Sequence, residues 1–186
     1  MAGDSVSAHR AGETVLIVKV PEAEPAVGEW RTQFDPVAAA GIPAHITVLA
    51  PFLDRRLVDA SVLGELEALV GKHQSFDLEL VRCRRFPGVL YLAPVPERGF
   101  RALTGAVAGR WPEAPPYGGQ FAEVVPHLTV AHSQDPQVFD MIESEISGRL
   151  PVTARIASVH LMACTGNRWE DVQSFLLAAG DNGRSR

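Results

Sequence analysis

The sequence predicts an α+β fold of two similar lobes, in which two antiparallel sheets related by a pseudo-two-fold axis carry outer helices and enclose a central cleft. Two observations lead to this prediction. The run His45-Ile46-Thr47-Val48 returns in the second half as His127-Leu128-Thr129-Val130. Around each copy the order strand, helix, histidine-containing strand, helix, strand recurs with a period of about eighty residues, which suits a duplicated lobe rather than a solenoid array.

The first half contains three predicted strands and two predicted helices. Thr14 to Val20 is a run of apolar and β-branched residues, typical of a buried strand, and Pro21 ends it. Apolar residues then recur at helical spacing, and Asp35-Pro36 interrupts that helix because proline disrupts a helix interior. The predicted elements are a strand over 14–20, a helix from about 25 to 41, the strand with His45 and Thr47, a helix over 56–72 and a strand over 76–85.

The second half repeats this order after a predicted hairpin turn at Pro87-Gly88. Asp135-Pro136 supplies a helix cap followed by a favoured first helical residue. The predicted elements are a strand over 89–92, a helix over 100–111, a loop over 112–119, the strand with His127 and Thr129, a helix over 136–149, a strand over 152–164 and a last strand over 175–177. We predict one bilobal domain over 13–179, with disordered ends at 1–12 and 180–186.

Composition and charge limit the functions that the chain can have. With 186 residues and a formal net charge of −5, the chain lacks the basic character of a protein with a long nucleic-acid footprint. No apolar run is long enough for a membrane-spanning helix, and the segment from Met1 to Glu13 shows no signal-peptide pattern. We therefore expect a cytoplasmic monomer without a membrane partner, in which Cys83 and Cys164 stay reduced.

In both repeated runs the histidine and the threonine are two residues apart. Side chains alternate between the faces of a strand, so His45 and Thr47 share one face while Ile46 and Val48 share the other. Two such strands could line a polar cleft in which one imidazole takes a proton, the other gives one, and threonine hydroxyls bind phosphate oxygens. The alternative is a pair of structural histidines that bond only to the backbone.

A metal site is the main rival interpretation of the two histidines. The sequence has no HExxH motif, no CxxC pair and no third or fourth ligand at a suitable spacing. His132 follows His127 by five residues, so a regular strand would turn it to the opposite face. The chain also lacks a GxSxG motif and a glycine-rich phosphate loop. We therefore predict a site that uses no metal and no cofactor.

The paired motifs, set in two similar halves, resemble those of the two-histidine (2H) phosphoesterase superfamily, which includes the bacterial 2′-5′ RNA ligases and cyclic nucleotide phosphodiesterases. The resemblance covers about residues 13–179. It implies a bilobal α+β fold and metal-independent hydrolysis of 2′,3′-cyclic phosphodiesters, or joining and cleavage of 2′-5′ RNA linkages. It further implies His127 as the base and His45 as the acid. The implied catalytic residues are His45, Thr47, His127 and Thr129.

One difference from this resemblance follows the second motif. RNA-ligase-like members often carry an arginine there, whereas this chain continues as Val130-Ala131-His132-Ser133. The difference favours hydrolysis of a small cyclic phosphodiester or of an RNA 3′-end over RNA end joining. A 2′-5′ RNA ligase and a non-catalytic module that binds a nucleotide or RNA end remain as alternatives, because a fold does not fix an activity.

Aromatic and basic residues supply further candidates for substrate binding. Phe52, Tyr91 and Tyr117 could stack on a base, with packing in the core as the alternative. Arg84 and Arg85 could pair with a small anion, with a solvent-exposed strand edge as the alternative.

Overall fold

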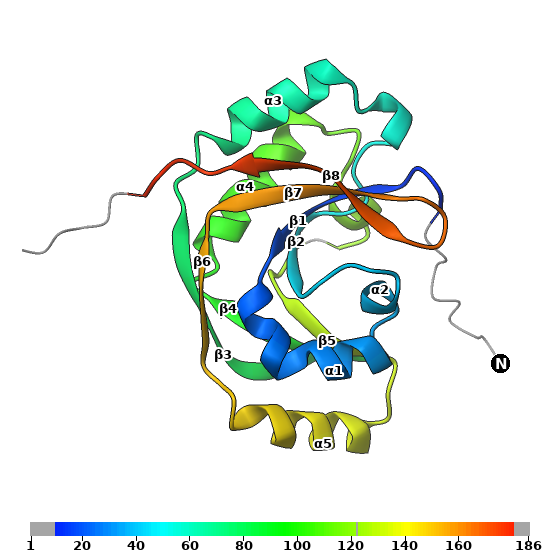
Figure 1. The fold of residues 1–186 in the computed structure, drawn as a ribbon, viewed down its shortest axis with the longest axis vertical. Coiled ribbons are helices and arrows are strands. Elements are labelled where there is room, and N and C mark those ends of the chain that lie inside the picture. The colour runs from blue at the N-terminus through cyan, green and yellow to red at the C-terminus, as the bar shows by residue number, and fades with distance from the viewer. Residues whose placement is uncertain (1–9, 122, 181–186) are drawn as a thin grey trace, which may run out of the picture.

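The structure, a computed structural model, describes residues 10–121 and 123–180 of the chain. Within these residues it confirms the predicted fold class, because two four-stranded antiparallel sheets carry helices on their outer sides (Figure 1). The greater part of the two predicted disordered ends, residues 1–9 and 181–186, lies outside the described residues. Gly12, predicted in the same lead-in, joins the fold, since its amide donates a 2.9 Å hydrogen bond to the carbonyl of Cys164.

The two repeated motifs lie at the edges of the two sheets. The first sheet has the strand order β2-β1-β7-β8 and the second has the order β5-β4-β3-β6. The strands are β1 (Thr14–Lys19), β2 (His45–Leu49), β3 (Phe76–Phe86), β4 (Val89–Val95), β5 (Leu128–His132), β6 (Val152–Ile156), β7 (Ser158–Cys164) and β8 (Trp169–Leu176). Because β2 and β5 are edge strands, each has one side open toward the other, and the two strands contact each other.

Each half of the chain contributes strands to both sheets. The first half ends with β3, which pairs with β4 of the second half, and β7 of the second half returns to pair with β1. The single strand predicted over 152–164 is therefore wrong. It divides at Ala157 into β6, which pairs with β3, and β7, because the chain crosses from one sheet to the other at this residue.

Helices and short 3-10 turns connect the strands. They are α1 (Glu24–Phe34), α2 (Pro36–Ala39), α3 (Ala60–Val70), α4 (Arg98–Arg110) and α5 (Pro136–Ser147), with 3-10 turns at η1 (Pro21–Ala23), η2 (Arg55–Leu57) and η3 (Pro116–Gly119). The predicted interruption at Asp35-Pro36 is confirmed, since the Asp35 side chain accepts a 3.2 Å hydrogen bond from the amide of Val37 and caps α2. In Figure 1, α3 and α4 lie at one end of the molecule and α1 and α5 at the other.

One apolar core joins both lobes. The helix α1 packs against β5 of the second half, and α4 packs against β2 of the first half. Leu16, Ile46, Leu90 and Val130, which come from both sheets, are completely buried in the same cluster. Neither half therefore has a core of its own, and the strands that hold the motifs are fixed by the whole chain.

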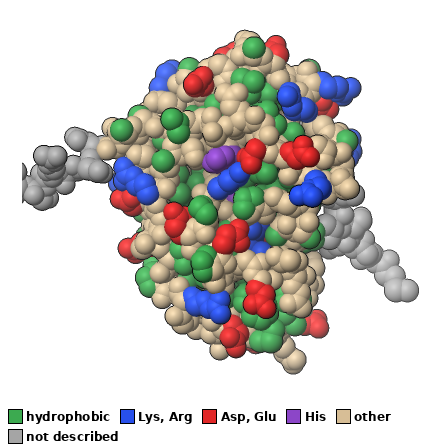
Figure 2. Space-filling model, viewed as in Figure 1, with side chains coloured by type: hydrophobic (Ala, Val, Ile, Leu, Met, Phe, Trp, Pro, Cys, Tyr) green, Lys and Arg blue, Asp and Glu red, His purple; other side chains and the backbone are tan. Residues whose placement is uncertain are grey.

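The surface is mixed in charge. Lys and Arg side chains are interspersed with Asp and Glu side chains over the face shown in Figure 2. Over the part of the chain that the structure describes, no helix combines the length and the apolar character that a membrane crossing requires. Cys83 and Cys164 are both free thiols, as predicted.

Candidate active site

The repeated motifs have the alternation that a half-buried strand requires. His45 and Thr47 are partly exposed, whereas the intervening Ile46 is completely buried. The second motif follows the same rule, with Thr129 partly exposed and Leu128 completely buried. His127 directly precedes β5 and is partly exposed on the same side as Thr129. Apolar anchoring of one face thus presents an imidazole and a hydroxyl on the other face of each strand.

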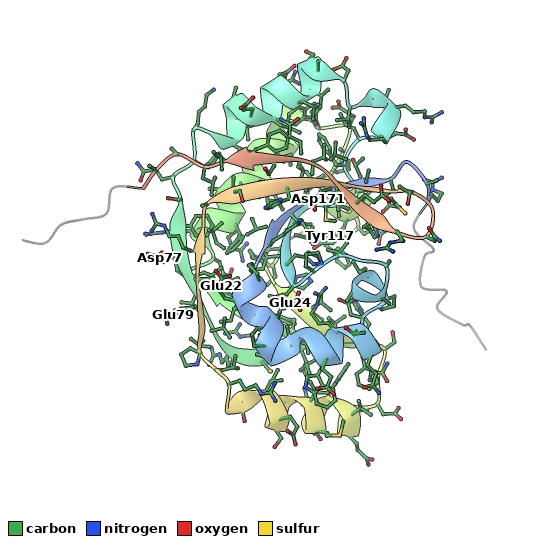
Figure 3. All side chains as sticks on the ribbon, viewed as in Figure 1. Glu22, Glu24, Asp77, Glu79, Tyr117 and Asp171 are labelled. Carbon is green, nitrogen blue, oxygen red and sulfur yellow. The ribbon has the colours of Figure 1, made fainter. Side chains whose placement is uncertain are left out.

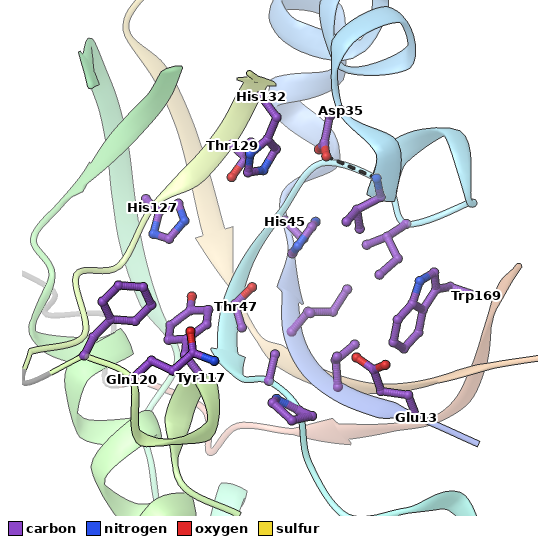
Figure 4. A pocket seen from close by; sticks show the side chains of 17 residues that line it. Glu13, Asp35, His45, Thr47, Tyr117, Gln120, His127, Thr129, His132 and Trp169 are labelled. Carbon is purple, nitrogen blue, oxygen red and sulfur yellow. Dashed lines mark hydrogen bonds between the residues drawn. The ribbon is translucent and has the colours of Figure 1, made fainter. Parts of the chain in front are cut away.

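The four side chains of the two motifs line one cavity of about 370 Å³, between the edges of the two sheets. Figure 4 shows His45 and Thr47 on one strand and His127 and Thr129 on the other, with the imidazoles on opposite sides of the cavity. A cavity of this size lies at the small end of the range that small-molecule sites occupy.

The two imidazoles make the same backbone hydrogen bond. Nδ1 of His45 lies 2.8 Å from the carbonyl oxygen of Pro43, and Nδ1 of His127 lies 2.7 Å from that of Val125. A carbonyl can only accept, so each Nδ1 carries the hydrogen. The bond that a structural histidine makes is thus present at both positions, but it uses Nδ1 alone and leaves Nε2 as the nitrogen that can exchange a proton with a ligand.

Burial makes both imidazoles hard to protonate. Burial lowers the pKa of His45 to about 3, and the positive charge of Arg31 and the nearby His127 contribute further. Burial also lowers the pKa of His127, with an added contribution from His132. Both rings are therefore neutral at pH 7 in the unliganded site, and a bound anion would favour the imidazolium form of either.

His132 lies in the same cavity, contrary to the prediction that it faces the other way. The pairing of β5 with β4 shifts between Tyr91, which lies opposite Thr129, and Leu90, which lies opposite Ala131. This β-bulge adds one residue to β5 and reverses the alternation beyond it. His132 consequently returns to the face of Thr129, as Figure 4 shows.

Comparisons with known proteins identify the family of the chain. A sequence model of the 2′-5′ RNA ligase superfamily matches residues 20–168, which is most of the chain. The chain belongs to the 2′-5′ RNA ligase superfamily. The resemblance of the two motifs to the 2H phosphoesterases is thereby confirmed. None of the curated protein sequences compared with the chain is similar enough to count as a match.

Several solved structures share the fold at low sequence identity. The Escherichia coli LigT complexed with 3′-AMP is 18% identical, with a TM-score of 0.62 over 90% of this chain and 99% of LigT. The same protein complexed with NADP⁺ is 20% identical, with a TM-score of 0.56 over 91% of this chain and 99% of LigT. TT0787 of Thermus thermophilus is 18% identical, with a TM-score of 0.62 over 90% of this chain and 98% of TT0787.

Tyr117 is the aromatic candidate that the structure brings into the cavity lined by the two motifs. Its phenol is hydrogen-bonded to the Thr47 side chain, and burial raises the pKa of that phenol. Its backbone has a φ of 51°, a left-handed conformation that is uncommon for a bulky residue. The surrounding loop holds it there, since the Tyr117 amide donates a 2.6 Å hydrogen bond to the carbonyl of Ala50.

Phe52 and Tyr91 are core residues and do not line the cavity. Phe52 packs edge-on against Trp111, with ring centroids 5.2 Å apart. Tyr91 stacks on Phe86 at 4.2 Å and meets the ring of His127 edge-on at 5.5 Å. Tyr91 therefore supports the imidazole from behind, and the core-packing alternative describes both residues.

The basic candidates also lie away from the cavity. Arg85 pairs with Asp140 and Glu143 of α5, with N–O distances of 2.7 Å to each. Arg84 is exposed on β3 and does not line the cavity. The positive charge nearest to the motifs instead belongs to the buried Arg31 of α1, which the sequence alone did not single out.

Several cavity residues were missed by reasoning from the sequence. Gln120 and Phe121 follow Tyr117 in the same Pro/Gly-rich segment, and their closeness to a named candidate was a usable signal. Trp169 has polar neighbours in the sequence, but it is the buried first residue of β8 and lines the cavity. The pairing of β8 with β7 and a 2.8 Å hydrogen bond from the Trp169 amide to the carbonyl of Ala40 bring it there, so no local pattern could have revealed it.

A second, apolar hollow of about 430 Å³ adjoins the cavity. It shares three residues with the cavity, namely Tyr117, Phe121 and His127. Its other lining residues are Phe86, Pro87, Val89, Glu123, Val124 and Val125. Across residues 10–121 and 123–180, no three His, Cys, Asp or Glu side chains come close enough to hold a metal ion together.

Proposed function

We propose that this protein is a metal-independent phosphodiesterase that hydrolyses the 2′,3′-cyclic phosphate of a nucleotide or of an RNA end. The observation that carries the proposal is the matched pair of Nδ1 bonds, which sets two equivalent imidazoles in one cavity with a hydroxyl beside each. His45 and His127 act as the acid-base pair, and Thr47 and Thr129 donate to the non-bridging phosphate oxygens.

The reaction requires two proton transfers on opposite sides of phosphorus. One imidazole Nε2 takes a proton from water as the water oxygen bonds to phosphorus. The bond from phosphorus to one ribose oxygen breaks, and the other imidazole gives that oxygen a proton. A phosphomonoester is the product. Two histidines on facing strands suit this division of labour, because one imidazole cannot readily serve both sides in a single in-line step.

The charge of the cavity favours a diester. Of the described residues that line it, none is Lys or Arg. A cyclic phosphodiester carries one negative charge, whereas a terminal phosphate carries up to two at neutral pH. Neutral imidazoles and hydroxyls can stabilise the single charge. The absence of Lys and Arg from the described lining also argues against a long RNA partner.

The nucleoside has a place beside the reacting phosphate. We assign its base to Tyr117 and Phe121, whose rings meet edge-on at 5.7 Å where the cavity joins the apolar hollow. Stacking on such side chains is the usual way to hold an unpaired base. Small nucleotides are present in two of the LigT structures, those with 3′-AMP and with ATP, which supports a ligand of this size.

A direct assay tests the proposal. The protein is incubated with 2′,3′-cyclic AMP, CMP, GMP and UMP, with and without excess EDTA, and the products are separated as 2′- and 3′-monophosphates. We expect turnover that EDTA does not change and that a His45→Ala/His127→Ala double variant lacks. Saturable binding without turnover would instead support the non-catalytic alternative, and joining of RNA ends without hydrolysis would support the ligase.

A further inference from the structure

The helix α1 carries a buried arginine. Arg31 is 2% exposed and is among the largest fully buried side chains. Its Nε donates a 3.1 Å hydrogen bond to the carbonyl oxygen of Thr129, in the second motif. One terminal nitrogen donates to the Asp35 carboxylate at 3.0 Å and to the carbonyl of Ile42 at 3.4 Å.

Glu24, two turns earlier on α1, holds the first motif. Its Oε1 accepts a 2.6 Å hydrogen bond from the amide of Ala44, the residue before His45. The same oxygen lies 4.0 Å from a terminal nitrogen of Arg31. Figure 3 shows Glu24 between α1 and the strands, in agreement with this bond. One helix thus bonds both to the segment that enters β2 and to β5.

The helix α1 links the two motifs, which lie in different sheets. The strands β2 and β5 belong to different sheets, so no ladder of backbone hydrogen bonds fixes their spacing. A buried charge is costly unless it is paired and hydrogen-bonded, and here Asp35 pairs it while two carbonyls accept from it. Packing alone could be achieved with apolar side chains, so such an arrangement indicates a positional role.

We propose, on the basis of the function assigned above, that Arg31 and Glu24 are positioning residues of the two-histidine site. They fix the main chain of both motifs relative to each other, and they place one buried positive charge beside His45. The proposal makes the two histidines unequal, although their own hydrogen bonds are alike.

The opposite helix shows what a neutral version of this bond looks like. Thr104 on α4 is buried, and its hydroxyl donates a 2.8 Å hydrogen bond to the carbonyl of Val48 on β2. Each motif strand is therefore bonded by a side chain from a helix of the other half. The bond to β5 comes from a cation and the bond to β2 from a hydroxyl, so only one of the two carries charge.

The groups that face His45 come from several elements. Arg31 and its partner Asp35 lie on and just after α1, His127 and His132 lie on the β5 side, and Glu13 lines the cavity before β1. After burial, the positive charge of Arg31 is the largest cause of the lowered pKa of His45. This charge disfavours protonation of the ring.

The first test uses surface-accessible Glu24. Its side chain is 38% exposed, so Glu24→Ala removes the bond to Ala44 without opening the core. We expect kcat for a cyclic nucleotide to fall about tenfold, because a small misplacement of a catalytic group has a large effect on rate. Glu24→Gln keeps an acceptor oxygen and should restore the rate. Glu29→Ala, on the exposed side of the same helix, is the matched control and should leave the rate unchanged.

The second test reads the histidines directly by NMR of protein with ¹⁵N-labelled imidazoles. In the unmodified protein we expect His45 to titrate below His127. In the double variant Arg31→Met/Asp35→Asn, which leaves no unpaired charge and keeps the cap oxygen of Asp35, the pKa of His45 should rise by at least about one unit. In Glu24→Ala the ring signals of His45 should shift, and in Glu29→Ala they should not.

Two results would overturn the proposal. One is a Glu24→Ala protein that matches Glu29→Ala in rate and in the His45 ring signals. The other is a His45 that titrates at or above His127 in the unmodified protein, which requires no variant to fold. The ring signals and titrations do not depend on turnover, so a protein that hydrolyses no cyclic phosphate would refute the proposed function while these measurements still decide the role of Arg31 and Glu24.

Discussion

His45 and His127 donate the same hydrogen bond from Nδ1, each to the carbonyl oxygen two residues earlier, at 2.8 Å and 2.7 Å. The bond fixes the tautomer and the plane of each ring, which is how proteins commonly orient a histidine that exchanges protons or binds a ligand through its other nitrogen. Each bond joins residues only two positions apart, so both motifs make it through their own local backbone.

Loss of either imidazole should reduce catalysis strongly. We expect His45→Ala and His127→Ala each to lower kcat on 2′,3′-cyclic nucleotides by roughly 10²–10⁴, the usual effect of losing a general acid or base. The double variant should lose much less than the product of the two effects, because the groups act as a unit. His160→Ala is the matched control, since His160 bonds to Ser158 and does not line the cavity. Near-normal turnover by either single variant would exclude the acid-base mechanism.

The threonines should matter less than the histidines. Thr47→Val and Thr129→Val keep the side-chain shape and remove one hydrogen-bond donor each, so kcat/KM should fall by about 5- to 20-fold. Because Thr47 also bonds to Tyr117, Thr47→Val should have the larger effect. Steady-state rates of both variants on one substrate decide the order. A loss as large as that of the histidine variants would mean that the hydroxyls take part in proton transfer.

Tyr117 should determine how well the base is recognised. Tyr117→Ala removes the ring beside the apolar hollow, and we expect KM for cyclic nucleotides to rise by about 5- to 150-fold, the range of one lost stacking contact. The effect should vanish on ribose 2′,3′-cyclic phosphate, which has no base to stack. An equal effect on both compounds would show that the ring acts on the phosphate, through Thr47, rather than on the base.

The buried imidazoles should make the fold sensitive to acid. His45 has a pKa near 6.5 when unfolded and about 3 when folded, so between these values the unfolded chain binds more protons. The stability that its neutral ring contributes is thus complete above about pH 6.5 and is lost as the pH falls toward 3. Urea unfolding should show a loss of roughly 4 kcal/mol from this group over that range, and a clearly smaller loss in His45→Gln. Parallel pH profiles of the two proteins would contradict the low pKa.

Local patterns predicted the parts of the structure that depend on neighbouring residues. The alternation in His45-Ile46-Thr47-Val48 is one example, and the helix interruption at Asp35-Pro36 is another, because strand period and proline sterics act within a few residues. The order of helices and strands before residue 152 also followed from such signals.

Features set by distant pairing could not be predicted. Residues 152–164 include neither Gly nor Pro, so nothing in the sequence around Ala157 marks the crossing between sheets. The bulge that turns His132 into the cavity depends on the register with β4. Arg31 reaches Thr129 across 98 positions of the chain, and its place on α1 is indistinguishable in sequence from a surface arginine.

The roles of the two histidines should differ, with His45 as the base and His127 as the acid. This reverses the assignment that the family resemblance implies. A general acid must be protonated before the reaction. The charge of Arg31 acts against a proton on His45, whereas the pKa of His127 is lowered by burial and by the neighbouring His132. A substrate with a good leaving group, such as a p-nitrophenyl phosphodiester, needs little help from an acid. His127→Ala should therefore keep most of its activity on that substrate, while His45→Ala should remain impaired on both.

Rates of each variant on the cyclic nucleotide and on the activated diester decide between the two assignments, with Glu29→Ala as the reference. If the activated diester rescues His45→Ala instead, the acid is His45 and the charge of Arg31 is overcome by the bound phosphate.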